Sequence, residues 1–256
     1  MTRDFTYETY ETLLKTYIEC GYHLTSYESY IQTFSENKKI VILRHDVDRQ
    51  PQNAFTVAQI ENKLGVKGSY YFRIVPDSFN IDCIKQIIDL GHEIGYHYED
   101  LTLAKGDYEK AIQLFEKNLN ELKRYYPVKT ICMHGSPLSK WDNKLLWQKY
   151  DYKKYGIIGE PYFDIDYDKF LYLTDTGRSW NSRSSNARDK VKSSFNYNLK
   201  STNDIIDKIN SNSLPPFIIQ NIHPQRWNDS LLSWVEELLM QNLKNLAKNI
   251  MIKTRK

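Results

Sequence analysis

Strand-like and helix-like segments alternate between residues 40 and 150, and this alternation constrains the fold more than any other feature of the chain. Apolar or β-branched runs that are typical of strands are followed by segments with helical spacing of apolar residues. Two of the helix-like segments end at Gly65 and Gly91, and glycine commonly terminates helices. Because parallel strands need long crossover connections, this pattern predicts an α/β fold with a mainly parallel sheet covered by helices.

The same pattern predicts the approximate bounds of the main elements. Strands are expected at residues 40–45, 69–75, 93–97, 130–134, 171–174 and 216–222. Helices are expected at residues 7–20, 51–64, 81–90, 108–125 and 231–251. Residues 177–194 have few large apolar side chains and are expected to form a polar loop. No internal repeat or linker is visible, so a single domain is predicted for residues 1–256.

Composition and charge exclude some classes of function. The chain has 256 residues and a net charge of +3, with no block of basic residues, so nucleic-acid binding is not expected. Cys20, Cys83 and Cys132 lie far apart and in no metal-ligand spacing, which indicates free thiols in a reducing compartment. The N-terminal residues lack the apolar core of a signal peptide, and no stretch approaches the roughly 20 apolar residues of a membrane span. A soluble cytoplasmic protein without a transmembrane segment is therefore expected.

Polar residues suited to metal chemistry follow the predicted strands. The candidates are Arg44, Asp46 and Asp48, then His97, Glu99 and Asp100, then His134, then Asp175, Arg178 and Trp180, and finally His223. Ligands and catalytic groups of parallel sheets gather at the carboxyl ends of strands. Asp46 and Asp48 point to the same side if the strand continues, so one could bind a metal while the other serves as a base. This set of residues favours metal-assisted hydrolysis with separate acid and base groups.

The motifs resemble those of the NodB-type polysaccharide deacetylases, carbohydrate esterase family four. Residues 44–48 read Arg-His-Asp-Val-Asp and are similar to a His-Asp-Val-Asp variant of the first family motif. Gly91–His97 reads Gly-His-Glu-Ile-Gly-Tyr-His and matches the phrase that precedes the second motif. His134–Pro137 occupies the place of the third motif, Asp175 and Trp180 loosely resemble the fourth, and Ile218–His223 fits the fifth.

The resemblance implies a fold and a set of roles. The expected fold is a single-domain distorted (β/α) barrel, with an N-terminal helical extension at residues 1–39, the motif-bearing barrel at 40–224 and a C-terminal helix at 225–256. By family analogy Asp46 is the general base, Asp48 and His97 bind a divalent metal, expected to be Zn²⁺, and His223 is the general acid. Asp175 is expected to orient His223.

Two positions depart from the family pattern. Leu101 stands where the family has a second metal-binding histidine, so Glu99, Asp100 or His134 is expected to provide the third ligand. The arginine of the third motif, which holds the catalytic aspartate in the family, is also missing. Arg44 or Arg178 is expected to supply that charge. His92 belongs to the family phrase but is not a ligand there, and we interpret it as structural.

The expected substrate is a small-molecule or lipid-linked aminosugar. The resemblance is strongest to a cytoplasmic subgroup associated with lipopolysaccharide or O-antigen sugar biosynthesis, which implies N-deacylation, acetyl or formyl, of a nucleotide- or lipid-linked precursor. Candidate substrate-binding residues are Arg44, Trp141, Arg178, Trp180 and Trp227, and Arg178, Arg183 and Arg188 are candidates for contacting a phosphate or carboxylate. Two alternatives remain open: a catalytically inactive sugar-binding homologue, and a metal-dependent amidohydrolase that acts on a non-sugar amide. The oligomeric state is not predicted.

Overall fold

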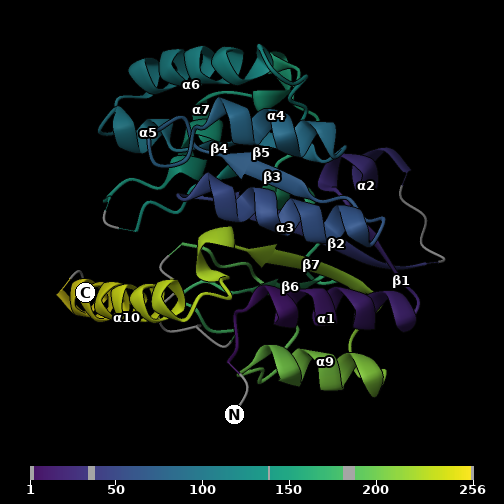
Figure 1. Ribbon diagram of the computed structural model, residues 1–256. Helices are drawn as coiled ribbons and strands as arrows, with labels where there is room; N and C mark the ends of the chain where they lie inside the picture. The colour runs from purple at the N-terminus through teal and green to yellow at the C-terminus, as the bar shows by residue number, and fades with distance from the viewer. Residues whose placement is uncertain (1–2, 34–37, 138, 181–187, 255–256) are drawn as a thin grey trace.

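A seven-stranded sheet forms the centre of the molecule, and every pair of neighbouring strands is parallel (Figure 1). The computed structural model describes residues 3–33, 38–137, 139–180 and 188–254. The strands are β1 (Tyr22–Thr25), β2 (Lys39–Val47), β3 (Ser69–Phe72), β4 (Glu93–Tyr98), β5 (Ile131–Met133), β6 (Leu171–Thr174) and β7 (Phe217–Ile222). Their order is β5-β4-β3-β2-β7-β6, and β1 pairs with the first half of β2. Within the described residues β5 and β6 do not pair with each other, so the sheet is a half-barrel.

Helices cover this sheet and give the fold its α/β class, as predicted. They are α1 (Tyr7–Glu19), α2 (Tyr27–Thr33), α3 (Pro51–Lys63), α4 (Ile81–Asp89), α5 (Asp100–Leu103), α6 (Tyr108–Lys123), α7 (Leu146–Lys149), α8 (Pro161–Asp164), α9 (Thr202–Asn210) and α10 (Leu231–Thr254). In Figure 1, α3 crosses in front of the sheet, α6 lies at the top of the view, and α10 extends from one side of the body. Parallel sheets covered in this way bury both faces of their central strands.

The central strand β2 explains why the sequence folds around residues 40–47. Ile40–Leu43 is buried, and β2 pairs with β7 along most of its length and with β3 at its carboxyl end. A strand buried on both sides requires a nearly continuous apolar run, which this segment has. The run ends in charged residues, and their position at the sheet's edge follows from the strand direction.

The predicted elements agree with the observed ones to within a few residues, and the shorter elements were missed. Gly65 and Gly91 have φ angles of +71° and +82° and follow α3 and α4, as expected for residues that end helices. The missed elements include β1, α2 and α9. A signal for α9 was present, because Ser201 and Asp204 form a capping box at its first turn.

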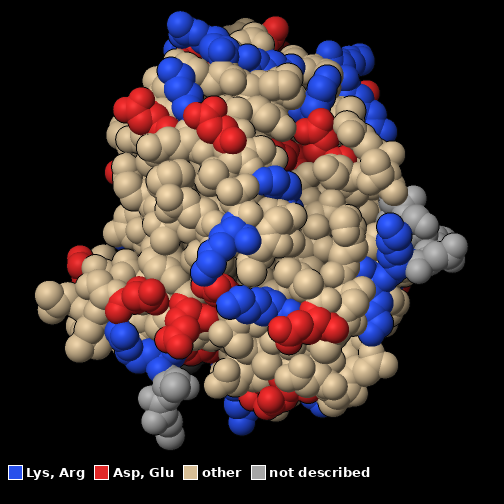
Figure 2. All heavy atoms as spheres, turned by 45° about the vertical axis from the view of Figure 1, so that its right-hand side comes forward, with Lys and Arg blue, Asp and Glu red and all other residues tan. Residues whose placement is uncertain are grey.

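The two ends of the chain also differ from the expectation. The segment 1–39 is more than a helical extension, because β1 joins the sheet beside β2. Helix α10 packs on the body through buried Glu237 and Gln241, while Leu232 on its opposite side is 84% exposed. Among the described residues, no helix has the length and apolar character that crossing a membrane requires. Figure 2 shows basic and acidic side chains interspersed on the face in view.

Candidate metal centre and active site

Four strands deliver the acidic and histidine side chains of the motifs to one edge of the sheet. Asp46 lies near the end of β2 and Asp48 just beyond it, His97 lies near the end of β4, and His134 and His223 follow β5 and β7. Because all strands run in the same direction, these ends meet. All five residues line one cavity of about 90 Å³. The sequence therefore placed these residues at the correct edge of the sheet.

One oxygen of Asp48 faces two imidazole nitrogens. Asp48 Oδ1 lies 3.5 Å from His97 Nε2 and 3.5 Å from His134 Nε2. This oxygen is buried and has no hydrogen-bond partner among the described residues, which is costly for a charged group. Ligands of a tetrahedral Zn²⁺ at about 2.0–2.1 Å from the ion stand roughly 3.4 Å from one another. The two distances from Asp48 Oδ1 match this spacing, so Asp48 could share a divalent cation with either histidine.

The outer nitrogens of both histidines are held by the protein. His97 Nδ1 lies 2.9 Å from the carbonyl oxygen of Cys132, and His134 Nδ1 lies 2.8 Å from Glu99 Oε2. Hydrogen bonds of this kind fix the ring orientation of metal-binding histidines and leave Nε2 for the metal. The geometry thus favours His134 over the other two residues that the sequence left open for the third ligand.

The other two candidates for the third ligand have different partners. Glu99 accepts hydrogen bonds from Arg73 Nε at 2.8 Å and pairs with His134 through its other oxygen, and these partners outweigh burial and lower its pKa to about 2. The expectation that Glu99 is a ligand is therefore corrected, because both oxygens support neighbouring side chains. Asp100 is buried and accepts hydrogen bonds from the Tyr96 hydroxyl, and burial raises its pKa to about 7. Its carboxyl group does not line the cavity.

Arg44 holds Asp46 through two parallel hydrogen bonds. Arg44 Nε donates to Asp46 Oδ1 at 2.9 Å and Nη2 donates to Oδ2 at 2.6 Å, and Asn221 donates to Oδ2 at 3.0 Å. Burial opposes ionisation of Asp46, but Arg44 and the nearby histidines lower its pKa below the ordinary value. Arg44 is 0% exposed, so the predicted substrate contact is wrong for this residue. It instead supplies the charge that the sequence left to Arg44 or Arg178.

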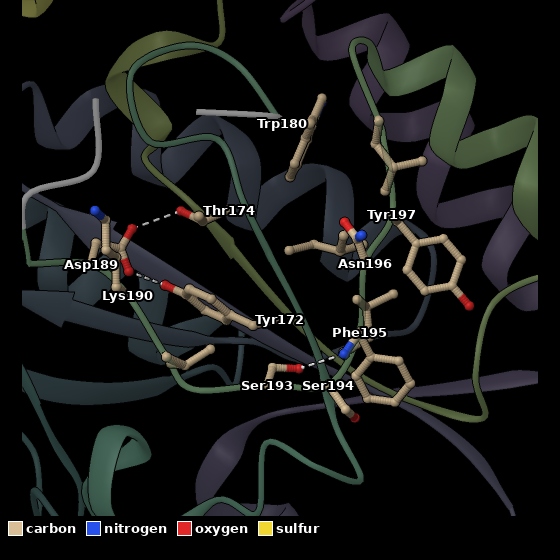
Figure 3. A pocket seen from close by; sticks show the side chains of 14 residues that line it. Tyr172, Thr174, Trp180, Asp189, Lys190, Ser193, Ser194, Phe195, Asn196 and Tyr197 are labelled. Carbon is tan, nitrogen blue, oxygen red and sulfur yellow. Dashed lines mark hydrogen bonds between the residues drawn. The ribbon is translucent and has the colours of Figure 1, made fainter. Parts of the chain in front are cut away.

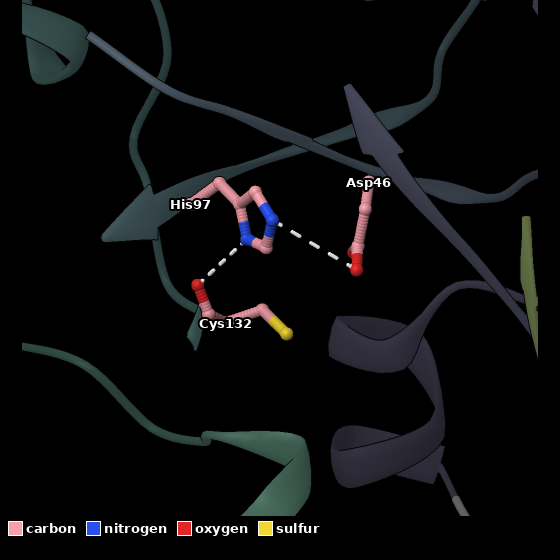
Figure 4. Close-up of side chains that lie close together, drawn as sticks. All are labelled: Asp46, His97 and Cys132. Atoms are coloured by element: carbon pink, nitrogen blue, oxygen red, sulfur yellow. Dashed lines mark hydrogen bonds and ion pairs between the residues drawn. The ribbon is translucent and has the colours of Figure 1, made fainter. Parts of the chain in front are cut away.

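Asp46, His97 and Cys132 form a second group that could hold a metal ion (Figure 4). Their ligand atoms lie within 4.8 Å of one another. Cys132 would need to be a thiolate to bind a metal, but burial raises its pKa well above the ordinary value. Asp46 is already bound to Arg44 through both oxygens. Asp48 Oδ1 has no hydrogen-bond partner among the described residues, so Asp48 is a better candidate ligand than Asp46.

His223 is fixed from behind by a buried carboxylate. His223 Nδ1 lies 2.6 Å from Asp175 Oδ1, and the backbone N–H of His223 also donates to Asp175. Asp175 further accepts hydrogen bonds from Arg226 Nη1 at 2.6 Å and Trp227 Nε1 at 2.8 Å. Burial opposes ionisation of Asp175, but Arg226 and His223 together lower its pKa. This arrangement leaves His223 Nε2 facing the cavity, 4.0 Å from Asp46 Oδ2.

The three tryptophans expected to contact a sugar lie elsewhere. Trp227 is fully buried and donates to Asp175, so it holds that carboxylate in place and has no face for a sugar. Trp180 is 8% exposed and lines a larger cavity beside β6. The ring of Trp141 packs against Gly106, where even a Cβ atom would clash with it. The substrate contact predicted for Trp227 is corrected because its ring is fully buried, and Trp141 and Trp180 do not line the cavity that holds Asp46 and His223.

The arginines of the predicted polar loop also bind protein groups. Arg178 Nη1 donates to the carbonyl oxygen of Trp234, and its guanidinium lies 4.5 Å from that ring, which fastens α10 to the body. The expected substrate contact of Arg178 is therefore corrected. Arg188 donates to the carbonyl oxygen of Gly135 and so stabilises the loop after His134. Arg183 lies outside the described residues.

Sequence reasoning missed Asp189, which lies between two cavities. It lines the small cavity with Asp46 and also the cavity of about 520 Å³ beside β6 (Figure 3). Four hydroxyl groups donate to its carboxylate, from Tyr162, Tyr172, Thr174 and Thr176. Burial opposes its ionisation, but Arg44 and these hydroxyls lower its pKa. No sequence signal separated this aspartate from other polar residues of its loop.

No protein-family model matches the chain, and no curated protein matches it. Among solved structures it is similar to BA3943, a CE4 family pseudoenzyme from Bacillus anthracis, at 16% identity over 84% of this chain and 63% of that chain, with a TM-score of 0.44. The chain thus spans less than two thirds of that protein. It is also similar to the Bc1960 peptidoglycan N-acetylglucosamine deacetylase, at 18% identity over 91% of this chain and 90% of that chain, with a TM-score of 0.42. The Xyl-CE4 domain of a multidomain xylanase from the hindgut metagenome of Trinervitermes trinervoides matches at 16% identity over 82% and 85%, with a TM-score of 0.41.

Proposed function

We propose that this chain is a metal-dependent hydrolase that removes an N-acyl group, acetyl or formyl, from an aminosugar. The observation that carries the proposal is Asp48 Oδ1, a buried oxygen without a hydrogen-bond partner among the described residues that faces Nε2 of His97 and of His134. The sequence motifs add support, since Asp46 and His223 occupy the positions of the base and the acid in the family that the motifs resemble.

Asp48, His97 and His134 would hold the divalent cation. One carboxylate and two imidazoles suit Zn²⁺, which is the expected ion, and leave a position for water and substrate. When bound, the ion polarises the amide carbonyl and lowers the pKa of a water molecule. Glu99 supports this set by holding His134 in place.

Asp46 is placed to take the proton of the attacking water. Its lowered pKa keeps it ionised at neutral pH, and the paired hydrogen bonds from Arg44 fix the direction of the carboxylate. Asp46 Oδ2 lies 3.8 Å from His97 Nε2, so the base is next to the metal-facing atoms without being held by them. A general base of this kind contributes about 10²–10⁴-fold to a hydrolysis rate.

His223 is placed to protonate the leaving nitrogen. Asp175 binds Nδ1, so the proton that can be transferred is on Nε2, which faces both Asp46 and Asp48 at 4.0 Å and 3.9 Å. Addition of water to the amide carbon and protonation of the nitrogen release a carboxylate and a free amine. The acid and the base thus act from two sides of one small cavity.

The alternative of an inactive sugar-binding homologue was motivated by two missing family residues. His134 lies where a third ligand is needed despite Leu101, and Arg44 holds Asp46 in place of the missing arginine. A pure binding protein would need neither the base nor the oriented acid. A non-sugar amide substrate would use the same site chemistry. Comparing amine release from aminosugars with amine release from simple amides distinguishes this alternative.

We further propose that the substrate is a nucleotide- or lipid-linked aminosugar used in surface polysaccharide biosynthesis. The test begins with the metal content of purified protein, followed by amine release from N-acetyl and N-formyl nucleotide sugars and from simple amides. Asp46→Asn should abolish turnover while metal stays bound, and Asp207→Asn on the exposed side of α9 is the matched control. Absence of bound metal together with absence of chelator-sensitive amine release would overturn the proposal.

A further inference from the structure

Helix α10 turns a polar side toward the body of the protein. Glu237 is buried and forms an ion pair with Arg49. One turn further on, Gln241 is also buried, and Asn245 Nδ2 donates to the carbonyl oxygen of Gly177 at 3.0 Å. A surface helix of a globular protein normally packs on the body through its apolar side. In α10 this arrangement is reversed, so its apolar side points away from the body.

The outward side of α10 carries large apolar side chains. They are between 38% and 84% exposed, and they are Leu231, Leu232, Val235, Leu239, Met240, Leu243 and Leu246. Five of them recur at steps of three or four residues and therefore lie along one face of the helix. We name this face, made of Leu232, Val235, Leu239, Leu243 and Leu246, the α10 face. Figure 1 shows α10 extending from one side of the body. A continuous exposed apolar face of this kind marks an interaction surface.

The α10 face is symmetric about Leu239. Val235 and Leu243 stand four residues before and after it, and Leu232 and Leu246 stand seven residues before and after it. When two copies of such a helix run antiparallel with Leu239 against Leu239, Leu232 of each copy lies opposite Leu246 of the other. Val235 then lies opposite Leu243. A two-fold interface has this property, because each contact between two different residues occurs twice. The α10 face is therefore complementary to a second copy of itself.

Two other arrangements fit the α10 face less well. In a parallel pair each residue meets its own copy, and Asn242 takes the seam position that follows Leu239. Burying that amide costs free energy unless it is hydrogen-bonded. Helices that lie on a membrane surface carry lysine or arginine beside their apolar side. In the described part of α10, the polar residues immediately beside the α10 face are Glu236 and Asn242, whereas Lys244 lines a cavity together with Glu237.

We propose that the α10 face binds a second copy of this chain, so that two α10 helices pack antiparallel about a two-fold axis at Leu239. One large apolar side chain buries roughly 60–120 Å² when it leaves water. Seven partly exposed side chains from each copy, with the polar residues around them, therefore remove on the order of 1,000 Å² from water. A specific interface needs about 1,000 Å², and at this lower limit the dimer should form at micromolar concentrations. The dimer does not depend on the proposed hydrolase activity.

Sedimentation velocity of the full chain over a range of concentrations tests for the dimer. The unchanged chain should shift from monomer to dimer as its concentration rises through the micromolar range. Leu239→Glu should weaken the dimer by at least about 100-fold, because each dimer loses two buried leucines and gains two like charges at the axis. Leu103→Glu, the same substitution at a residue of α5 that is 45% exposed, is the matched control and should leave the dimer unchanged. Thermal melting checks that both variants are folded.

Cysteine cross-linking in a Cys20→Ser background tests the direction of the two helices. The substitution removes a partly exposed thiol, and Cys83 and Cys132 are buried. A mixture of Leu232→Cys and Leu246→Cys chains should form a covalent dimer on treatment with diamide, because an antiparallel pair brings these two positions together. Leu232→Cys chains alone should not cross-link.

Three results would overturn the proposal. The first is a chain that stays monomeric throughout the micromolar range, or a dimer that Leu239→Glu does not weaken. The second is cross-linking of Leu232→Cys chains with one another and not with Leu246→Cys chains, which would show a parallel pair. The third comes from flotation with vesicles of phosphatidylcholine and phosphatidylserine: binding of a monomeric chain that Leu239→Glu removes would assign the α10 face to lipid.

Discussion

The two faces of β2 carry histidine and carboxylate clusters that look alike in composition and differ in how completely the protein satisfies them. His45 and Asp46 are neighbours in the chain and point to opposite faces, as successive residues of a strand do. His45 Nε2 lies 2.8 Å from Glu61, in the interior, and Asp46 lies 3.8 Å from His97, at the cavity. The interior cluster is wholly buried, whereas the side chains of His134 and Asp48 in the cavity cluster are 15% and 23% exposed.

In the interior cluster, protein groups surround the carboxylate completely. Glu61 accepts hydrogen bonds from the hydroxyls of Tyr10 at 2.5 Å and Tyr70 at 2.7 Å, and it pairs with His45. His92 lies 3.4 Å from Glu61 and bridges two backbone groups, in agreement with the structural role expected for it. A buried carboxylate with all its partners present stabilises one arrangement and leaves nothing for a ligand.

In the cavity cluster, Asp48 Oδ1 lacks a hydrogen-bond partner among the described residues. The comparison teaches that histidine and carboxylate content alone does not mark a functional site. A buried carboxylate oxygen that faces two imidazoles without a hydrogen-bond partner among the described residues is a stronger indication, because the folded protein bears its desolvation cost until a cation binds.

Replacing Asp48 in the cavity cluster should have the largest effect on metal binding. Asp48→Ala should abolish stoichiometric metal binding, because it removes the only carboxylate among the three proposed ligands. The metal-free variant should also be less stable than the metal-free parent at neutral pH, since the neighbouring histidines lower the pKa of Asp48 and so favour its ionised form in the folded state. Metal analysis and urea denaturation measure the two effects, and a variant that retains a full equivalent of metal would contradict the assignment.

Replacing Glu61 in the interior cluster should lower stability and leave metal binding unchanged. Glu61→Ala should lower the free energy of unfolding by about 3–5 kcal/mol, because it leaves its buried partners unpaired. Metal stoichiometry should not change where the variant is folded. Glu116→Ala on the exposed side of α6 is the control. An equal loss of metal and of stability in Glu61→Ala would mean that the two clusters are one functional unit.

Asp100 extends the comparison, because it is an interior carboxylate that pairs with no cationic side chain among the residues that the structure describes. Burial raises its pKa to about 7, so the folded state keeps a proton that the unfolded state releases near pH 4. Its contribution to stability should therefore fall as the pH rises from about 4 to about 7. Asp100→Asn should gain stability relative to the parent by on the order of 2 kcal/mol between pH 5 and pH 8. Chemical denaturation at both pH values measures this, and a pH-independent difference would show that Asp100 ionises normally.

The smallest expected effect comes from Glu99, which supports the cavity cluster from outside. Glu99→Gln keeps an acceptor for His134 but removes the charge, so metal affinity should fall about 10–100-fold, as for other residues that orient a ligand. Competition with a chelator measures the affinity. A complete loss of metal would return Glu99 to the set of direct ligands.

The fold followed from the sequence because its signals are local. The apolar run before Asp46, the helical spacing after Pro51 and the glycines that end two helices lie within short windows, and these elements formed where expected. β1 and α2 were missed because such short segments carry few periods of a pattern. The candidate residues at strand ends were also found, since one topological rule places all carboxyl ends of parallel strands at one edge.

The sequence by itself determined the α/β class, the order of the motifs and the identity of Asp46, Asp48, His97 and His223 as neighbours. The tertiary structure alone favours His134 over Glu99 and Asp100, pairs Arg44 with Asp46 and buries Trp227. The physical reason is that a side chain's partners depend on which strands are adjacent and on which face each residue occupies. Composition and spacing along one strand do not contain that information.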